Sequence, residues 1–427
     1  MLKYIKIRNF LSFYEETEIS FESSKRWNKK DNCFKINNTV LDKSMLIYWA
    51  NASWKSNILK AINFVRDFAL NRWNNYLYKP FKFNEKKEPS FLEIWFFVDK
   101  KEYIYNFEIL DNFVNSENLI EVSKWKKNIL FSRDKEWIKK VWKSFKEEMN
   151  KWIEKIRPEV SALSVLSQWN WKLNNKSIDY FFSRINVIWW NQNFLKLTLD
   201  LIEWINIWEW FEKDMYKKII LQILRNSDIL IDDFKIIPLE FFISEVEEVW
   251  LKIPKEILNF MKNNGNTSFK DRQIIFYRKD KKWKEIPFSF ETEESLWTRK
   301  LFSLIWPILH TILTEWVLFI DEIENNLHEF IVENIFKLLH SDLGKKYQVI
   351  MTSHNINFMN LDNFRKTQIW IVGKNDFASE FYTLYDFPEL RSENKIKNYY
   401  RNWAFWWIPN VSEFTSIIDI IKWESKN

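Results

Sequence analysis

Hydrophobic and polar positions alternate in short runs near the start of the chain. Three runs with apolar residues at about every second position predict strands of an antiparallel sheet, and they cover Tyr4–Ile7, Phe91–Val98 and Glu102–Ile109. Another apolar run, Met45–Tyr48, leads into a turn, and a helical pattern begins after it at Ser56. The first part of the chain therefore predicts an antiparallel sheet beside a strand–turn–helix unit.

The middle of the chain has a different pattern. A stretch rich in Lys and Glu carries apolar residues at helical spacing, which predicts helices; these residues are Ile138, Val141, Phe145, Met149 and Ile153. Sustained heptads are missing, so we expect a compact helical lobe rather than a long coiled coil. Strands are expected again at 229–237, 241–246 and 273–277, with a polar loop at 262–272.

Composition and charge narrow the protein class. The 427 residues are 46% hydrophobic and 29% charged, with a net charge of +6, which is enough for two or three globular domains. The single cysteine, Cys33, excludes a disulfide framework and a Cys-based zinc site. The apolar run 301–320 is interrupted by His310, Glu315 and Pro307, so we expect a core helix and a core strand rather than a membrane span.

The numbers of glycine and tryptophan are far from usual: the chain has 3 Gly and 26 Trp. Average usage would give roughly 30 Gly in a chain of this length, and turns with positive φ favour Gly. We hypothesise that most of these Trp stand where the cellular protein has Gly. Some bacteria translate the UGA codon as glycine, whereas another codon table gives Trp. The alternative is a Trp-rich protein, and UGG codons in the gene would establish it.

The turn before Ser56 tests this hypothesis. With Gly in place of Trp49 and Trp54 it becomes the phosphate-binding pattern G-x-x-x-x-G-K-S between a strand and a helix. Backbone N–H groups of such a loop surround the β-phosphate, while Lys55 would reach the β- and γ-phosphates and the Ser56 hydroxyl would ligate Mg²⁺. A Lys-Ser pair that opens an ordinary helix is the alternative. The predicted nucleotide-binding residues are Trp49, Asn51, Ala52, Ser53, Trp54, Lys55, Ser56 and Asn57.

Two adjacent carboxylates end a buried strand at 316–320. Asp321 would hold Mg²⁺, directly or through water, and Glu322 would act as the general base toward the attacking water. A surface corner is the alternative for such a pair taken alone. Together with the loop before Ser56, the pair predicts a nucleotide-hydrolysing site.

Two further segments could contact a nucleotide. With Gly in place of Trp297, Ser295 and Thr298 belong to a Ser-x-Gly-Thr turn at a helix start, which suits a nucleotide offered by a second subunit; a plain Ser N-cap is the alternative. His354 follows the predicted strand 347–352. There it would contact the γ-phosphate, although a lone His is more often a satisfied core residue.

The order of these motifs resembles the ATP-binding-cassette (ABC) superfamily in its SMC/RecF/OLD-like branch, and more narrowly the AAA15 family of bacterial ATPases. The resemblance extends from the opening segment 2–13 to 367–372 and 400–409. Trp370 matches a position where relatives often have a true Trp, so some Trp are expected to be genuine. The implied roles are nucleotide binding for Lys55 and Ser56, hydrolysis for Asp321 and Glu322, a switch for His354, and a signature contact for Ser295 and Thr298. A Q-loop Gln has no evident place; 91–110 offers none.

The resemblance also implies an architecture and an activity. We expect an α/β fold, an ABC/SMC-type P-loop NTPase core with a flanking antiparallel sheet and a helical insertion lobe. Residues 1–115 would form the first half of the core, 116–227 the helical insertion, and 228–427 the second half. The implied function is a cytoplasmic ATPase that uses ATP and Mg²⁺ and acts as a nucleotide-gated homodimer, with a role in anti-phage defence and a separately encoded effector protein. Too few residues follow His354 for the Toprim nuclease domain of OLD proteins.

Two alternative functions remain open at this point. One is a scaffold that binds ATP and hardly hydrolyses it; the other is a RecF-like DNA-repair clamp. Clusters of lysines could contact DNA phosphate, although solvated faces are the commoner explanation; they are Lys124, Lys126 and Lys127, and Lys279, Lys281 and Lys282. ATP-dependent, salt-sensitive DNA binding would favour the clamp.

The glycine hypothesis predicts a difference in ATP affinity. The indole of Trp54 would fill the space that a phosphate needs, so we expect the printed chain to bind ATP weakly or not at all. The variant with Trp49→Gly, Trp54→Gly and Trp297→Gly should recover binding. Equilibrium titration of both chains with a fluorescent ATP analogue measures the difference, and equal affinities would contradict the hypothesis.

Overall fold

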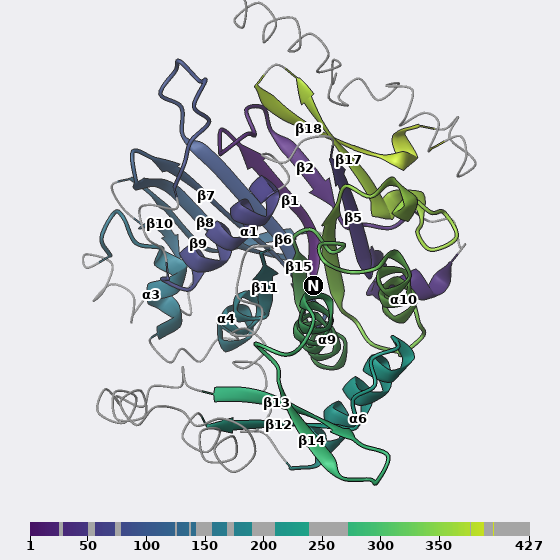
Figure 1. Cartoon of the computed structure of the whole chain (residues 1–427). Helices are drawn as coiled ribbons and strands as arrows, with labels where there is room; N and C mark the ends of the chain where they lie inside the picture. The colour runs from purple at the N-terminus through teal and green to yellow at the C-terminus, as the bar shows by residue number, and fades with distance from the viewer. Residues whose placement is uncertain are drawn as a thin grey trace, which may run out of the picture.

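The computed structural model describes most of the chain. The described residues are 1–24, 29–49, 56–72, 78–123, 126–135, 138–141, 156–168, 175–189, 210–238, 272–375, 377–387 and 396. Within them the chain forms a seven-stranded sheet, a six-stranded sheet, a three-stranded sheet and a two-stranded pair (Figure 1). None of the described helices is long and apolar enough to cross a membrane.

The seven-stranded sheet is antiparallel throughout, in the order β10-β9-β8-β7-β6-β1-β2. Its strands are β1 (Leu2–Arg8), β2 (Thr17–Ser20), β6 (Ser90–Val98), β7 (Lys101–Leu110), β8 (Phe113–Ser123), β9 (Lys126–Asp134) and β10 (Ile138–Val141). The three strands predicted from alternation fall on β1, β6 and β7. That part of the fold is therefore confirmed.

The expected start of the helical insertion at residue 116 is wrong. Residues 116–134 continue the antiparallel sheet as β8 and β9, and 138–141 form β10. Buried and more exposed positions alternate along much of β8, which is the two-residue period of a strand. The polar residues of β8 hide this period, since one of its buried positions is Glu117. The described helices of the range 116–227 are α3 (Ala162–Gln168), α4 (Asn175–Ser183) and α6 (Trp210–Asn226). Residues 142–155, with Phe145, Met149 and Ile153, lie outside the described residues.

The six-stranded sheet has the order β11-β15-β16-β5-β17-β18, parallel except for β18. Its strands are β5 (Ser44–Trp49), β11 (Ile185–Ile188), β15 (Val317–Ile320), β16 (Gln348–Ser353), β17 (Ile369–Asn375) and β18 (Ala378–Thr383), and its main helices are α1 (Ser56–Ala69), α9 (Leu296–Thr314) and α10 (Glu329–Leu339). The predicted strand–turn–helix unit, the core helix and the two core strands all occur here. The fold class is thus a mixed α/β core with a flanking antiparallel sheet.

The remaining elements are short. β3 (Cys33–Ile36) pairs with β4 (Thr39–Asp42), and the three-stranded sheet consists of β12 (Asp233–Pro238), β13 (Arg272–Lys279) and β14 (Glu285–Ser289). Single 3₁₀ turns cover Lys30–Asn32, Ile356–Phe358, Lys366–Gln368 and Leu384–Asp386. The expected strands near 229–237 and 273–277 appear as β12 and β13. The expected strand 241–246 lies outside the described residues, as does the loop 262–272 except for Arg272, which opens β13.

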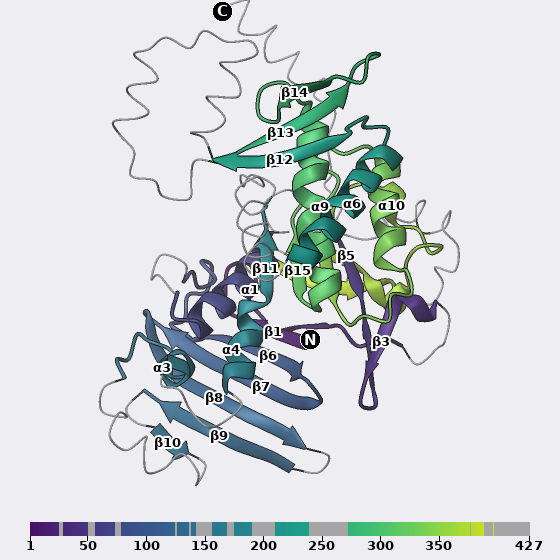
Figure 2. The ribbon, with the colours of Figure 1, turned by 90° about the horizontal axis from the view of Figure 1, so that it is seen from below.

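The parallel sheet separates two hydrophobic cores. Its strands are buried on both faces, because successive side chains point to opposite sides. In β15, Val317 and Phe319 join one core with α1 and the antiparallel sheet, whereas Leu318 and Ile320 join the other core with α9 and α10. Figure 2 shows the antiparallel sheet on one side of the molecule and α9 with the three-stranded sheet on the other.

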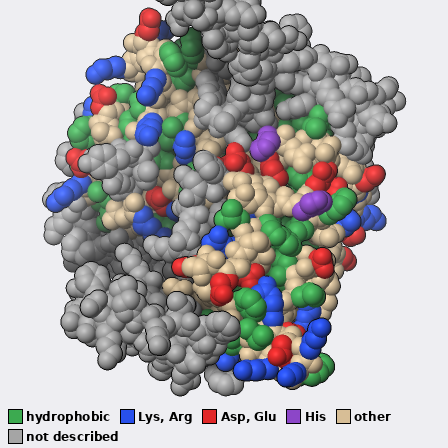
Figure 3. Space-filling view, in the orientation of Figure 1, with side chains coloured by type: hydrophobic (Ala, Val, Ile, Leu, Met, Phe, Trp, Pro, Cys, Tyr) green, Lys and Arg blue, Asp and Glu red, His purple; other side chains and the backbone are tan. Residues whose placement is uncertain are grey.

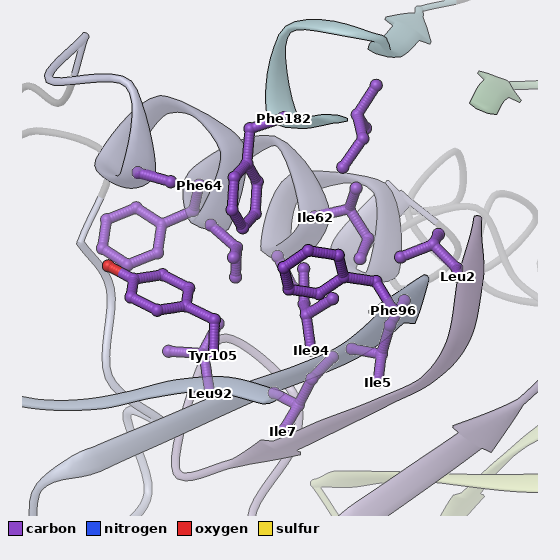
Figure 4. Close-up of a cluster of buried hydrophobic side chains, with 14 of the residues drawn as sticks. Leu2, Ile5, Ile7, Ile62, Phe64, Leu92, Ile94, Phe96, Tyr105 and Phe182 are labelled. Carbon is purple, nitrogen blue, oxygen red and sulfur yellow. The ribbon is translucent and has the colours of Figure 1, made fainter. Parts of the chain in front are cut away.

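Helix α1 is fixed by packing on the antiparallel sheet. Ile62 and Phe64 of α1 face β1, β6 and β7, and Phe182 of α4 closes the cluster (Figure 4). Fully burying a side chain of this kind contributes about 1.5–3 kcal/mol. The first turn of α1, which begins with Ser56, is therefore held in a defined place relative to the sheet.

Helix α9 is fixed by aromatic contacts with the three-stranded sheet. The ring of Phe302 lies 5.1 Å from Phe234, 5.1 Å from Phe276 and 5.3 Å from Phe290, measured between centroids. Trp306, one turn later, stands 6.2 Å from Phe302. These contacts hold the start of α9 at Ser295 against the core.

Left-handed turns in the described residues are made mainly by Asn and Asp, which adopt positive φ more readily than other residues with a side chain. They are Asn9, Asn37, Asn71, Asp99, Asp111, Asn112, Asp228 and Asn326. Trp283 also has a positive φ, of 63°, in the tight turn between β13 and β14, and it is 80% exposed. A bulky L-residue in this conformation costs about 1–2 kcal/mol, which supports Gly at position 283 in the cellular protein. Trp370 differs: it is 6% exposed and its indole N–H donates to the Thr367 carbonyl at 3.1 Å.

These two tryptophans should respond oppositely to replacement by glycine. Trp283→Gly relieves the left-handed backbone and should raise the free energy of unfolding by about 1 kcal/mol. Trp370→Gly removes a buried ring and should lower it by about 3 kcal/mol or more. Urea denaturation of the two variants and the parent chain measures both changes. A loss of stability in Trp283→Gly would contradict the assignment of glycine there.

Candidate functional site

Three parallel strands bring the predicted motifs to one edge of the six-stranded sheet. β16 lies between β15 and β5, with Ile320 opposite Met351 and Ser353 opposite Tyr48. Because the carboxyl ends of parallel strands meet at the same edge, ligand sites form there in open α/β sheets. The segments that follow these three strands carry the Asp-Glu pair, His354 and the loop before α1.

Asp321 is the best-defined group of the site. Its carboxylate is fully buried, and it accepts hydrogen bonds from the Ser56 hydroxyl at 3.1 Å and from the Thr352 hydroxyl at 2.8 Å. The Asp321 N–H donates to the Ile188 carbonyl at 2.8 Å. The structure therefore brings together Ser56 and Asp321, the two residues predicted from the sequence as metal ligands, although 265 positions separate them.

Thr352 was missed by sequence reasoning. Besides donating to Asp321, its hydroxyl accepts the backbone N–H of Glu322 at 2.8 Å. Glu322 has a φ of 48°, and non-glycine residues in this left-handed region often cluster at functional sites. The available signal was a lone threonine at the end of an apolar strand, one position before Ser353, which alone is weak.

The oxygen atoms of Ser56 and Asp321 fit a magnesium ion. Mg²⁺ prefers hard oxygen ligands and takes one or two from the protein, with waters and substrate phosphates completing its shell. Among the described residues no group of three or more His, Cys, Asp or Glu side chains could hold a metal.

Much of the predicted phosphate-binding loop lies outside the described residues. Trp49 is the last residue of β5, and the predicted nucleotide contacts Asn51, Ala52, Ser53, Trp54 and Lys55 fall within the undescribed range 50–55. Asn57 is buried, and its side-chain amide donates to the Ser12 hydroxyl at 2.9 Å. This contact ties the second residue of α1 to the loop after β1.

Ser295 forms the N-cap of α9, as the plain interpretation of this segment expected. Its hydroxyl accepts the Thr298 N–H at 3.2 Å and lies 2.8 Å from the Thr298 hydroxyl. Ser295 is exposed, Trp297 is partly buried and Thr298 is buried. Contact with a nucleotide of a second subunit stays a prediction.

His354 is exposed and held by one carboxylate. The side chain of His354 is 61% exposed, and its Nδ1 lies 2.8 Å from Oε1 of Glu324, whose side chain is only 9% exposed. The same oxygen accepts the His354 N–H at 2.7 Å. On the face shown in Figure 3, His side chains lie beside Asp and Glu side chains. His354 therefore reaches the surface at the edge where the other motifs gather.

The other three histidines have structural roles: two are at least partly buried and one caps a helix. Burial lowers the pKa of His310 to about 4 and that of His340 to about 3, and His340 Nε2 lies 2.6 Å from the Ser44 hydroxyl. His328 is the N-cap of α10, with Nδ1 accepting the Phe330 N–H at 3.4 Å.

Lys300 is a buried cation beside the acidic groups. It belongs to α9, is 5% exposed, and feels the negative charges of Glu322, Asp321 and Glu324. Burial lowers the pKa of the Lys300 ammonium to about 8, and the three carboxylates act against this shift. Helix α9 and the Asp-Glu turn are thus electrostatically linked.

A strand that sequence reasoning missed borders the site. β11 is parallel to β15 and ends at Ile188, at the same edge of the sheet. The stretch 91–110, searched for a Q-loop Gln, forms β6 and β7 of the antiparallel sheet instead. Gln192 follows four positions after β11, outside the described residues. With four residues, β11 is too short to give a clear period-2 signal.

The two lysine clusters lie on different sheets. Lys126 and Lys127 open β9, Lys279 is the last residue of β13, and Lys281 and Lys282 belong to the turn between β13 and β14. Figure 3 shows Lys and Arg side chains along the edge of the molecule where β13 and β14 lie. Lys124 is outside the described residues.

Comparisons with known proteins agree with these motifs. Residues 267–360 match the family described as "AAA domain, putative AbiEii toxin, Type IV TA system". This segment is therefore similar to AAA-type ATPase domains. It includes the Ser295 turn, the Asp321–Glu322 pair and His354, whereas the loop before Ser56 precedes it. No curated protein matches the chain.

Solved structures with similarity to the chain include heads of SMC proteins. The SMC head domain from Thermotoga maritima has 13% sequence identity and a TM-score of 0.43, with 90% of this chain and 98% of that chain covered. An SMC head bound to the C-terminal winged-helix domain of ScpA has 13% identity and a TM-score of 0.42, with 90% and 97% covered. An SMC head with an extended coiled coil, bound to the C-terminal domain of ScpA from Pyrococcus furiosus, has 13% identity and a TM-score of 0.41, with 92% and 99% covered.

Thr352 provides a test of the site's internal hydrogen bonds. Thr352→Val keeps the shape but removes a donor to Asp321 and an acceptor for the Glu322 N–H. We expect the free energy of unfolding to fall by about 1–3 kcal/mol. Thr352→Ser retains the hydroxyl and should lose markedly less. Chemical denaturation measures both variants, and equal losses would show that the hydroxyl contributes nothing.

Proposed function

We propose that this protein hydrolyses ATP to ADP and phosphate and that ATP joins two copies of the chain. The observation that carries the proposal is the contact between Ser56, at the start of α1, and the buried Asp321 carboxylate at 3.1 Å. In P-loop ATPases a hydroxyl and a carboxylate in these positions hold Mg²⁺. The AAA-type domain at 267–360 supports nucleotide as the ligand.

Each residue of the site has a part in the proposed reaction. Bound Mg²⁺ would neutralise developing charge on the β- and γ-phosphates. Ser56 and Asp321 would hold the ion, and the loop 49–54 with Lys55 would bind the phosphates. Glu322 would accept the proton of the attacking water as general base. With its Nδ1–H on Glu324, His354 would donate from Nε2 to an oxygen of the γ-phosphate as an imidazolium, because only the protonated ring has two N–H donors.

The exposed N-terminus of α9 supports the proposed dimer. Its exposed N-cap, Ser295, offers backbone N–H groups and the positive end of the helix dipole, which favour a phosphate from outside the subunit. A ligand that bridges two subunits stabilises the dimer only while it is bound. ATP would therefore join the subunits and hydrolysis would release them.

The proposal also includes a biological role in defence. The name of the matched family contains an abortive-infection toxin and a toxin–antitoxin system, which favours a role in defence together with a separately encoded partner. A nucleotide-gated pair suits such a role, because its assembled state can control an effector.

A variant at Glu322 tests both hydrolysis and dimerisation. In the chain with glycine at positions 49, 54 and 297, Glu322→Gln should lower kcat by at least about 100-fold and leave ATP binding intact. The variant should then accumulate as a nucleotide-bound dimer, detected by light scattering after gel filtration with ATP.

Ser295→Ala tests the proposed dimer interface separately from hydrolysis. It should weaken the ATP-dependent dimer without changing ATP affinity of the monomer. A Glu322→Gln chain with unchanged turnover would remove Glu322 from the reaction. Measurable ATP binding with negligible turnover in the Gly-restored parent would favour the non-hydrolysing scaffold.

A further inference from the structure

Glu324 lies in a tight turn after the Asp-Glu pair and is not part of the reaction proposed above. The turn is closed by the N–H of Asn325, which donates to the Glu322 carbonyl at 3.0 Å, and by the N–H of Leu327, which donates to the Glu324 carbonyl at 3.0 Å. With a side chain that is 9% exposed, Glu324 is well anchored beside the site. Its backbone and side chain are thus fixed more firmly than those of a surface carboxylate.

One oxygen of Glu324 holds His354 at two points. Oε1 accepts the backbone N–H at 2.7 Å and lies 2.8 Å from the ring Nδ1. The first contact fixes the backbone of His354, and the second fixes the rotation of its imidazole ring. A ring that is 61% exposed has few other constraints, and an unrestrained exposed side chain samples several rotamers.

The contact also selects the tautomer of His354. A carboxylate accepts only, so Nδ1 carries the hydrogen of the neutral ring, and Nε2 faces away from Glu324. When the ring takes up a second proton at Nε2, this nitrogen can donate to a phosphate oxygen while Nδ1–H stays on Glu324. In histidines that act at metal or catalytic sites, a carboxylate on the far nitrogen orients the ring in the same manner. Glu324 therefore decides which nitrogen of His354 can meet a ligand.

Glu324 also interacts electrostatically with helix α9, which begins after the Ser295 turn. Lys300 of α9, five positions after Ser295, is 5% exposed and feels the charges of Glu322, Asp321 and Glu324. Glu324 consequently lies where three segments meet: the turn after β15, the residue after β16 and helix α9. None of the motifs predicted from the sequence includes it.

We propose that Glu324 is a positioning residue, which holds the Nδ1 side of His354 so that Nε2 points toward the γ-phosphate position. This inference rests on the proposed function. Glu324 itself touches neither ATP nor water in this proposal and acts only through His354. The nearby pair of Glu329 and Asn357, joined at 3.2 Å between Oε2 and Nδ2, offers a matched carboxylate that does not contact His354.

Kinetics of five variants of the Gly-restored chain test the proposal. Glu324→Ala should lower kcat by about 10- to 100-fold, with KM for ATP changed less than about twofold. His354→Ala should have a similar effect, and the double variant should be no slower than His354→Ala alone, because both changes remove one function. Glu324→Gln keeps an oxygen that accepts both N–H groups and should retain most of kcat. Glu329→Ala should behave as the parent.

The tautomer of His354 gives a readout that does not depend on turnover. Nitrogen-15 NMR of labelled histidine should show the Nδ1–H form of His354 in the parent and in Glu324→Gln, and a mixture with the Nε2–H form in Glu324→Ala. An unchanged tautomer in Glu324→Ala would overturn the proposal, as would independent, multiplying losses in the double variant. If the Gly-restored chain binds ATP but does not hydrolyse it, the proposed hydrolysis fails, and the tautomer still decides the role of Glu324. Thermal unfolding of Glu324→Ala confirms that the chain is folded.

Discussion

The site depends on one physical constraint, which is that a fully buried carboxylate needs hydrogen-bond donors or cations around it. Asp321 obtains its donors from Ser56 and Thr352, so the start of α1, the end of β15 and the end of β16 must meet at one point. Removing any of these segments would take away a hydrogen bond or a neighbour of this buried carboxylate, at a cost in free energy. The same geometry brings a hydroxyl and a carboxylate together, which in the proposed function would hold a magnesium ion.

The two hydrophobic cores hold this meeting point from opposite sides of the parallel sheet. Alternate residues of β15 and β16 belong to different cores, for example Phe319 to one and Ile320 to the other. Helix α1 is pressed against the antiparallel sheet, and α9 is held by the aromatic cluster around Phe302. The geometry of the candidate site therefore rests on rigid elements, whose packing is costly to disturb.

Electrostatic contacts connect segments that are packed independently. Lys300 brings a positive charge from α9 toward the carboxylates, and Glu324 links the turn after β15 to His354. A nucleotide that changed the place of one segment would alter the contacts of the others.

The sequence alone determined the elements whose signals are local. Alternation identified β1, β6 and β7, the strand–turn–helix unit gave the place of Ser56, and two adjacent carboxylates after an apolar strand identified Asp321 and Glu322. Tertiary structure decided what depends on neighbours distant in the chain. β8 is a strand because β7 offers it a partner, and β9 is a strand because β8 does, despite the charged residues of β9. β11 is held by β15 although it is only four residues long. Thr352 and Glu324 have no distinctive sequence pattern; their roles arise because folding brings β16 beside β15, where short-range hydrogen bonds can form.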